Sequence, residues 1–99
     1  MWKCYLVRCS NGDLYCGITL DLDKRIRAHN SGKGSKIVRG KLPVELVWYL
    51  SFQSRSEASQ MEYAIKRYPK SVKEGLVLDG GELRNPGYGI DVSNQCRIG

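Results

Sequence analysis

The sequence contains no stretch approaching the roughly 20 apolar residues that a membrane-spanning helix needs. Its start, Met1-Trp2-Lys3-Cys4, also lacks the apolar region of a signal peptide. We therefore expect a cytoplasmic protein that has no membrane partner.

The cysteines lack the paired spacing of a zinc site. None of them, Cys4, Cys9, Cys16 or Cys96, belongs to a C-x2-C pair, the spacing that zinc sites favour. Disulfides are rare in the cytosol. The sequence therefore predicts no zinc site, and cysteines that serve as small buried apolar residues.

Internal repeats and long linkers are absent from the 99 residues. A chain of this length falls within the usual size range of one domain. Beyond residue 80, repeated glycines, a proline and little periodicity predict a loosely ordered tail. We expect a folded domain over residues 1–79 and this tail over residues 80–99.

Acidic residues are outnumbered by basic ones. Sixteen Lys and Arg against ten Asp and Glu give a net charge of +6, which attracts polyanions, most commonly nucleic acid. Much of the charge lies in a glycine-rich loop over residues 32–41. We expect its side chains to bind phosphates, with affinity that falls as salt rises. They are Lys33, Lys36, Arg39 and Lys41.

The first part of the chain is predicted to form a β-hairpin. Two strand-prone runs, residues 4–7 and 14–19, flank an Asn-Gly pair, whose residues tolerate the positive φ of a tight turn. Alternation along the second strand places Tyr15 and Gly17 on the same face.

Helices and a third strand are predicted after the hairpin. Asp21 is a good N-cap for a helix over residues 22–30, and residues 44–52 form an apolar strand. Capping boxes that begin at Ser54 and Ser71 predict two further helices. The first of these has a buried stripe at helical spacing: Ala58, Met61, Ile65 and Tyr68.

Five side chains are candidates for chemistry on a phosphodiester: Tyr5, Tyr15, Arg25, His29 and Glu62. Hydrolysis of this bond needs a metal, a cation for the developing charge and a group that activates water. Glu62 can hold Mg²⁺, and Arg25 can bind phosphate with its planar guanidinium. His29 lies four residues after Arg25, on the same side of the helix. A tyrosine with its ordinary pKa of about 10 is almost entirely protonated at pH 7, so nearby cations or a metal-bound water must lower the cost of using it as a base.

These residues form an ordered pattern: Tyr5, then Tyr15-Cys16-Gly17, then Arg25 and His29, then Glu62. The pattern resembles the GIY-YIG endonuclease superfamily, whose G-I-Y motif corresponds to Lys3-Cys4-Tyr5 and whose Y-I-G motif corresponds to Tyr15-Cys16-Gly17. The segments L-Y-C-G-I-T-L-D-L-D-K-R-I-R-A-H-N-S-G-K-G and E-Y-A-I-K-R look like its small stand-alone YhbQ-like (UPF0213) branch. The resemblance covers residues 2–78. It implies an α+β fold, a three-stranded antiparallel β-sheet flanked by helices.

The resemblance also implies catalytic roles. Tyr15 would be the general base, or would relay a proton from the attacking water, and Tyr5 would position that water and the phosphate. Arg25 would stabilise the transition state, and His29 would tune or orient Tyr15. Glu62 would be the only protein ligand of one divalent metal ion, Mg²⁺ or Mn²⁺.

Two further positions concern the surroundings of this site. Gly17 would let the backbone pack closely where a side chain would obstruct the site. Many members carry an additional asparagine after the helix that bears the glutamate. Neither Asn85 nor Asn94 is assigned to that position, because both fall in the predicted tail.

Two functions follow from these expectations. The first is a metal-dependent endonuclease or nicking enzyme, a monomer or weak dimer, that hydrolyses branched or damaged DNA in repair. The second is a nucleic-acid-binding module with this fold and little catalysis, because a small catalytic domain leaves little surface for choosing a target. RNA is retained as an alternative ligand, since a basic surface does not distinguish it from DNA. A protein-interaction domain ranks last, because it rests only on Trp2 and Trp48, which we expect in the core.

Overall fold

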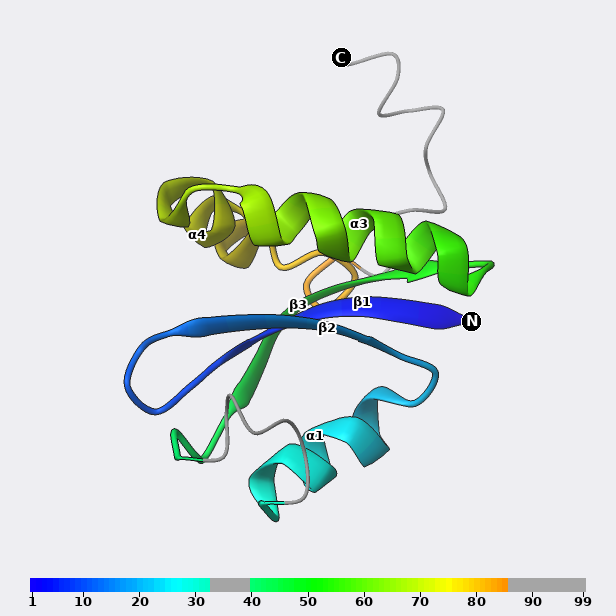
Figure 1. The fold of residues 1–99 in the computed structure, drawn as a ribbon. Coiled ribbons are helices and arrows are strands. Elements are labelled where there is room, and N and C mark those ends of the chain that lie inside the picture. Colours follow the sequence, from blue (N-terminus) through cyan, green and yellow to red (C-terminus); the bar gives the residue numbers. More distant parts are fainter. Residues whose placement is uncertain (33–39, 86–99) are drawn as a thin grey trace.

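The computed structural model describes residues 1–32 and 40–85 of the chain. Its centre is a three-stranded antiparallel sheet in the order β2-β1-β3 (Figure 1). The strands are β1 (Trp2–Arg8), β2 (Leu14–Thr19) and β3 (Glu45–Phe52). The helices are α1 (Leu22–Asn30), α3 (Arg55–Arg67) and α4 (Lys70–Asp79). This α+β architecture confirms the fold class expected from the sequence.

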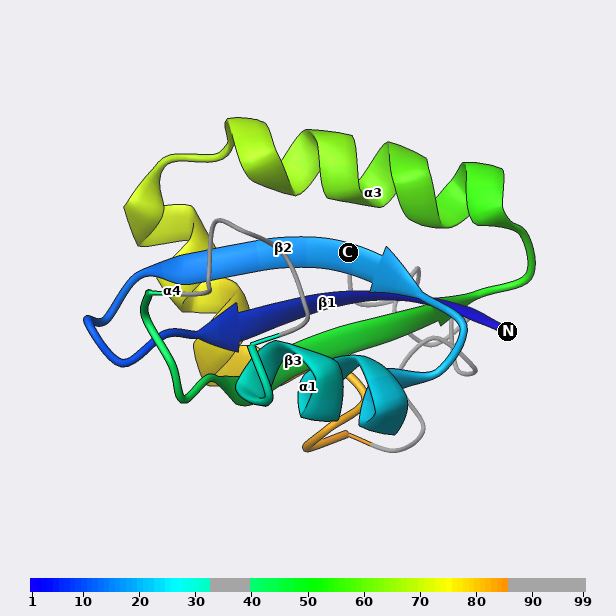
Figure 2. The same ribbon diagram turned by 60° about the horizontal axis from the view of Figure 1, so that its bottom comes forward.

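The helices cover opposite faces of the sheet. α3 and α4 lie on one face, and α1 lies on the other (Figures 1 and 2). Because β2 is an edge strand, side chains from α1 and α3 can approach each other beside it. None of the helices in the described part of the chain is long and apolar enough to cross a membrane.

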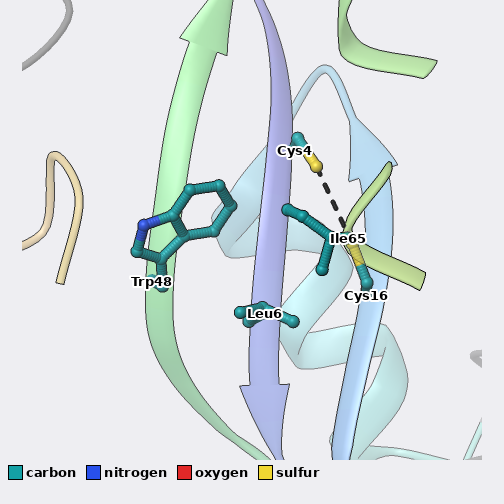
Figure 3. Packing of buried hydrophobic residues seen from close by; sticks show 5 residues of the cluster. All are labelled: Cys4, Leu6, Cys16, Trp48 and Ile65. Atoms are coloured by element: carbon teal, nitrogen blue, oxygen red, sulfur yellow. Dashed lines mark hydrogen bonds between the residues drawn. The ribbon is translucent and has the colours of Figure 1, made fainter. Parts of the chain in front are cut away.

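Strand alternation divides the core into two layers. The layer against α3 contains Cys4, Leu6, Cys16, Trp48 and Ile65 (Figure 3). The layer on the opposite face contains Tyr5, Val7, Cys9 and Val44. In the first layer the Sγ atoms of Cys4 and Cys16 lie 3.8 Å apart. The hydrogen bond with Cys16 and burial raise the pKa of the Cys4 thiol, so this side chain packs as a neutral group.

Local sequence signals explain where the hairpin and α3 begin. In the turn between β1 and β2, Gly12 has a φ of +92°, and the Asn11 side chain accepts a hydrogen bond from the Asp13 N–H at 3.0 Å. At the start of α3, Ser54 and Glu57 form the predicted capping box. These features depend on neighbouring residues alone, and each lies where the sequence predicts it.

The capping box predicted at Ser71 is wrong. α4 begins at Lys70, its N-cap is Pro69, and no side chain caps it. Glu74, the expected partner of Ser71, instead accepts two hydrogen bonds from the Arg8 guanidinium, at 3.0 and 2.5 Å. This ion pair ties α4 to the end of β1, and no local pattern predicts a contact across such a sequence separation.

Residues 80–85 contrast with the loosely ordered tail expected from this point. Gly81 forms a parallel bridge with Tyr49, and the Glu82 carboxylate accepts hydrogen bonds from the N–H and hydroxyl of Ser51. This segment is ordered because its backbone and its carboxylate both find partners on β3. The remainder of the predicted tail, residues 86–99, lies outside the described residues.

Candidate active site

A cleft of about 710 Å³ lies beside the edge strand β2. It is lined by residues of β1, β2, α1 and α3, including four of the candidate side chains: Tyr5, Tyr15, Arg25 and Glu62. The fifth candidate, His29, is fully buried and contacts both tyrosines. The structure therefore brings all five candidate residues to one place, although they come from four separate elements.

Two side-chain anchors position α1, which carries Arg25 and His29. At its start, the Asp21 carboxylate accepts a hydrogen bond from the Lys24 N–H at 3.1 Å. Near its end, the Asn30 amide accepts from the Val44 N–H at 2.7 Å and donates to the Val44 carbonyl at 3.2 Å. The helix is thus held at its end to the segment that leads into β3.

Gly17 makes room for the Tyr5 ring. The two residues are direct partners in the β1–β2 ladder. A Cβ atom on Gly17 would lie 2.6 Å from the Tyr5 hydroxyl oxygen and 2.8 Å from the adjacent ring carbon. These distances are too short for van der Waals contact, so any side chain at this position would displace the Tyr5 ring from the cleft.

His29 is hydrogen-bonded to Tyr5. Its Nε2 lies 3.0 Å from the Tyr5 hydroxyl, while its ring meets Tyr15 edge-on, with centroids 5.6 Å apart. The implied role of His29, orienting Tyr15, therefore has only ring packing to act through. Burial, and then the charge of Arg25, lower the pKa of His29. The imidazole is consequently neutral at pH 7.

Tyr5 also stays neutral at physiological pH. Burial raises the pKa of Tyr5 to about 12, and the nearby Arg25 charge only partly offsets this effect. A phenol with this pKa is unsuited to accept a proton from water, but it can donate a hydrogen bond. Its place in the cleft therefore suits a positioning group, as the resemblance implies.

Glu62 lines the cleft from α3. Its side chain is 23% exposed and forms an ion pair with Lys66 at 3.3 Å. No group of three or more His, Cys, Asp and Glu side chains that could hold a metal occurs within residues 1–32 and 40–85. One accessible carboxylate fits Mg²⁺ or Mn²⁺ only as a partly hydrated ion that substrate phosphate also ligates, which is a common arrangement for Mg²⁺.

Among the further residues that line the cleft, two that add positive charge and one that adds an aromatic ring were not predicted from the sequence. Lys24 and Arg55 add positive charge to its walls, and Trp2, expected in the core, lines it with a half-buried ring. The Arg55 guanidinium lies over that ring, 5.6 Å from its centroid. Arg55 precedes Glu62 by two helical turns, and this spacing could have placed both on one side of α3.

Of the basic loop over residues 32–41, the structure describes only Gly32, Gly40 and Lys41. Lys41 lies outside the cleft and forms an ion pair with Asp13 at 3.0 Å. The other three predicted phosphate ligands, Lys33, Lys36 and Arg39, lie outside the described residues. Their contact with nucleic acid stays a prediction.

Of the two unassigned asparagines, the structure describes only Asn85. Asn85 donates a hydrogen bond to the Asp79 carbonyl at 2.8 Å, beside the segment that pairs with β3. Asn94 lies outside the described residues. Asn85 is not among the residues that line the cleft.

Comparison with protein families gives one match that covers most of the chain. Residues 1–74 match the GIY-YIG catalytic domain. The match includes all five candidate residues and both motifs that carry the resemblance in the sequence.

Individual relatives agree with this match. A UPF0213 protein of Vibrio cholerae is 52% identical over 77 residues, which cover 77% of this chain and 76% of the relative. A UPF0213 protein of Haloquadratum walsbyi is 42% identical over 82 residues, 83% of this chain and 92% of the relative. The solution NMR structure of a UPF0213 protein from Bacillus halodurans is similar with a TM-score of 0.54 and 42% identity, and covers 87% of this chain and 94% of that one.

Proposed function

Since the chain belongs to the GIY-YIG family, in its UPF0213 branch, we propose that it is a metal-dependent endonuclease that hydrolyses DNA phosphodiester bonds. GIY-YIG domains are nuclease domains that act on nucleic acid and generally use divalent metal ions. The observation that carries the proposal is the convergence of Tyr5, Tyr15, Arg25 and Glu62 on one cleft, backed by His29.

Hydrolysis requires an activated water and a stabilised phosphate. Water forms the new bond to phosphorus, the bond to the leaving sugar oxygen breaks, and that oxygen takes a proton from solvent. Tyr15 receives the proton of the attacking water, either as a phenolate base or as a relay that passes its own hydroxyl proton on to solvent. Arg25 binds the phosphate oxygens, where its planar guanidinium stabilises developing negative charge.

His29 orients the hydroxyl of Tyr5 in this scheme. Among the described residues, Nδ1 of His29 has no hydrogen-bond partner. A buried N–H without an acceptor is rarer than a buried lone pair without a donor, so we assign the proton to Nε2, which then donates to Tyr5. The Tyr5 hydroxyl hydrogen is thereby free to point at the substrate phosphate or at the water.

Glu62 would hold the metal ion, Mg²⁺ or Mn²⁺. Bound there, the ion supplies positive charge that stabilises the phosphate as negative charge develops. Lys66 now pairs with the same carboxylate, but its side chain is 54% exposed and can turn to solvent. With one such site per chain, a monomer nicks one strand, and two copies are needed to cut both. Selection of branched or damaged DNA, and a role in repair, belong to this proposal by family analogy.

Cleavage of labelled plain, nicked, branched and single-stranded DNA with Mg²⁺ or Mn²⁺ tests the proposal. Tyr15→Phe and Glu62→Ala are each expected to lower the rate by about a hundredfold or more, as is typical for the loss of one stabilising group. Tyr63→Phe and Glu45→Ala serve as matched controls, because both residues are exposed and lie outside the cleft. Absence of cleavage of every substrate with either metal would sink the proposal.

The second candidate is a nucleic-acid-binding module with little catalysis. The observation that favours it is the pair between Glu62 and Lys66, which neutralises the carboxylate without any metal. Glu62→Ala separates the two candidates. A nuclease loses cleavage while its fold is retained, whereas a binding module binds as before, or slightly more tightly because a negative charge is gone.

A further inference from the structure

A second, smaller hollow lies on the other side of Tyr15. It has a volume of about 230 Å³, and its lining includes Tyr15, which also lines the cleft of the candidate active site, called the catalytic cleft below. The remaining residues come from the β1–β2 turn, the start of β2, the segment before β3 and the start of α4. They are Cys9, Asp13, Leu14, Lys41, Lys70 and Lys73. We call this hollow the lysine pocket.

The lysine pocket has an excess of positive charge. Three lysines face one carboxylate, Asp13, which pairs with Lys41 at 3.0 Å. Within residues 1–32 and 40–85, neither Lys70 nor Lys73 has a carboxylate within ion-pair distance. The first turn of α4 contains no acidic residue either, although acidic side chains are the ones that the positive end of a helix favours. The two carboxylates whose pKa values the Lys70 charge lowers, Asp13 and Glu74, are already paired with Lys41 and Arg8. Positive charge therefore remains in excess at the pocket.

The fold itself keeps these charges in place. Arg8 at the end of β1 binds the carboxylate of Glu74 through two hydrogen bonds. Glu74 directly follows Lys73 in α4. This pair holds the first turns of α4 near the hairpin, so the two lysines do not depend on a flexible segment.

We propose that the lysine pocket binds a backbone phosphate of the strand that is cut, next to the phosphate in the catalytic cleft. Tyr15 would lie between the two phosphates. The ligand is identified by its chemistry. A nucleic-acid strand carries a phosphate at every nucleotide, so a strand with one phosphate in the cleft must continue past Tyr15 with another. The identification of the ligand as a nucleic-acid strand rests on the proposed function. The two positions would fix the direction of the strand along β2.

DNA binding without metal tests the pocket independently of catalysis. A fluorescein-labelled nicked duplex is titrated by anisotropy in EDTA at several salt concentrations. Lys70→Gln/Lys73→Gln is expected to raise Kd about tenfold at low salt and to reduce the slope of log K against log salt by about one, as for one lost phosphate contact. The matched control, Arg27→Gln/Arg67→Gln, removes the same net charge from exposed residues outside the pocket. It is expected to change Kd less than twofold.

A gain of affinity provides the opposite test. Asp13→Asn keeps the shape of the side chain but removes the one carboxylate among the described residues that line the pocket. It releases Lys41 from its ion pair, so Kd is expected to fall about threefold with a steeper salt dependence. Loss of any carboxylate tightens the binding of a polyanion somewhat, so the gain is compared with that of Glu45→Gln, an exposed carboxylate outside the pocket, which is expected to be smaller. Unchanged or weaker binding by a folded Asp13→Asn protein therefore counts against the pocket.

The outcomes separate this inference from the proposed function. If the protein binds DNA through these lysines but no metal supports cleavage, catalysis fails and the pocket stands. If the protein cleaves DNA but the lysine variant binds like the arginine control, the pocket is overturned and catalysis stands. Absence of DNA binding by the wild type overturns the pocket as well. Where cleavage occurs, single phosphates beside the cut are replaced one at a time by uncharged methylphosphonates. One of these replacements should weaken binding by the wild type. The same replacement should have no effect on binding by the lysine variant.

Discussion

Gly17 shows how a single residue type can shape the cleft. Its backbone is paired with that of Tyr5 in the ladder, and the space where a side chain would start is occupied by the Tyr5 ring. The glycine is needed for this close approach and not for an unusual backbone angle, since Gly17 is not among the glycines with positive φ. Any larger residue requires a shift of the Tyr5 hydroxyl, the group that is hydrogen-bonded to His29.

Gly17→Ala is therefore expected to lower the free energy of unfolding by about 1–3 kcal/mol through overpacking. Cleavage should fall at least tenfold, because Tyr5 leaves its position. Gly75→Ala is the matched control. Gly75 lies inside α4, where an added Cβ meets no atom within 4 Å, so this change should stabilise the protein by about 0.5–1 kcal/mol. Denaturant unfolding and cleavage rates measure both effects; equal behaviour of the two variants would contradict this account of the site.

At the scale of elements, α3 and α4 begin in different ways although the sequence offers each a capping box. Ser54 caps α3 through its side chain, and Glu57 completes the box. In α4 the N-cap is Pro69, whose backbone is extended and whose side chain caps nothing, and the carboxylate of Glu74 is bound by Arg8. A tertiary ion pair has therefore replaced a local cap.

This difference predicts unequal effects of two similar substitutions. Ser54→Ala should cost about 1 kcal/mol of stability, because it removes the N-cap of the helix that carries Glu62. Ser71→Ala should cost a few tenths of a kcal/mol at most, since Ser71 caps nothing. Thermal and urea unfolding of the two variants provide the comparison. Equal losses would mean that α4 starts at the local cap after all.

For the whole molecule, the burial of His29 links folding to pH. The pKa of His29 is lowered in the folded protein by burial and by the Arg25 charge, whereas the unfolded chain has the ordinary value of about 6.5. Above that value neither state is protonated, and the full stability is present. Below it the unfolded state takes up a proton that the folded state resists, so stability falls as the solution becomes more acidic.

The free energy of unfolding is accordingly expected to fall as the pH drops below about 6.5, by at most about 1.4 kcal/mol for each pH unit. His29 is the only histidine of the sequence, so NMR titration of one imidazole signal reports its pKa directly. Asp13 and Glu74 have lowered pKa values, and they lose their contribution only at more acidic pH. A His29 pKa at or above 6.5 in the folded protein would contradict the prediction.

Local patterns in the sequence account for much of this fold. An Asn-Gly turn, an N-cap at Asp21 and the Ser54 capping box locate three elements, because each acts over a few residues. The same reasoning fails at Ser71, where the competing partner of Glu74 is 66 residues away. The order of residues 80–85 was not predicted for a related reason, because it depends on partners in β3, which is distant in the sequence.

The order of residues along the chain was enough to indicate the hairpin, the helices, the family pattern and the five candidate side chains, because these depend on local spacing or on a recognisable motif. Only the tertiary structure decided which groups meet. Sheet register sets Tyr5 against Gly17, the packing of α1 buries His29 behind Tyr5, and α4 brings two lysines to the far side of Tyr15. Such contacts join residues far apart in sequence, and they are determined by which arrangement buries the apolar faces and pairs the charges of the whole chain.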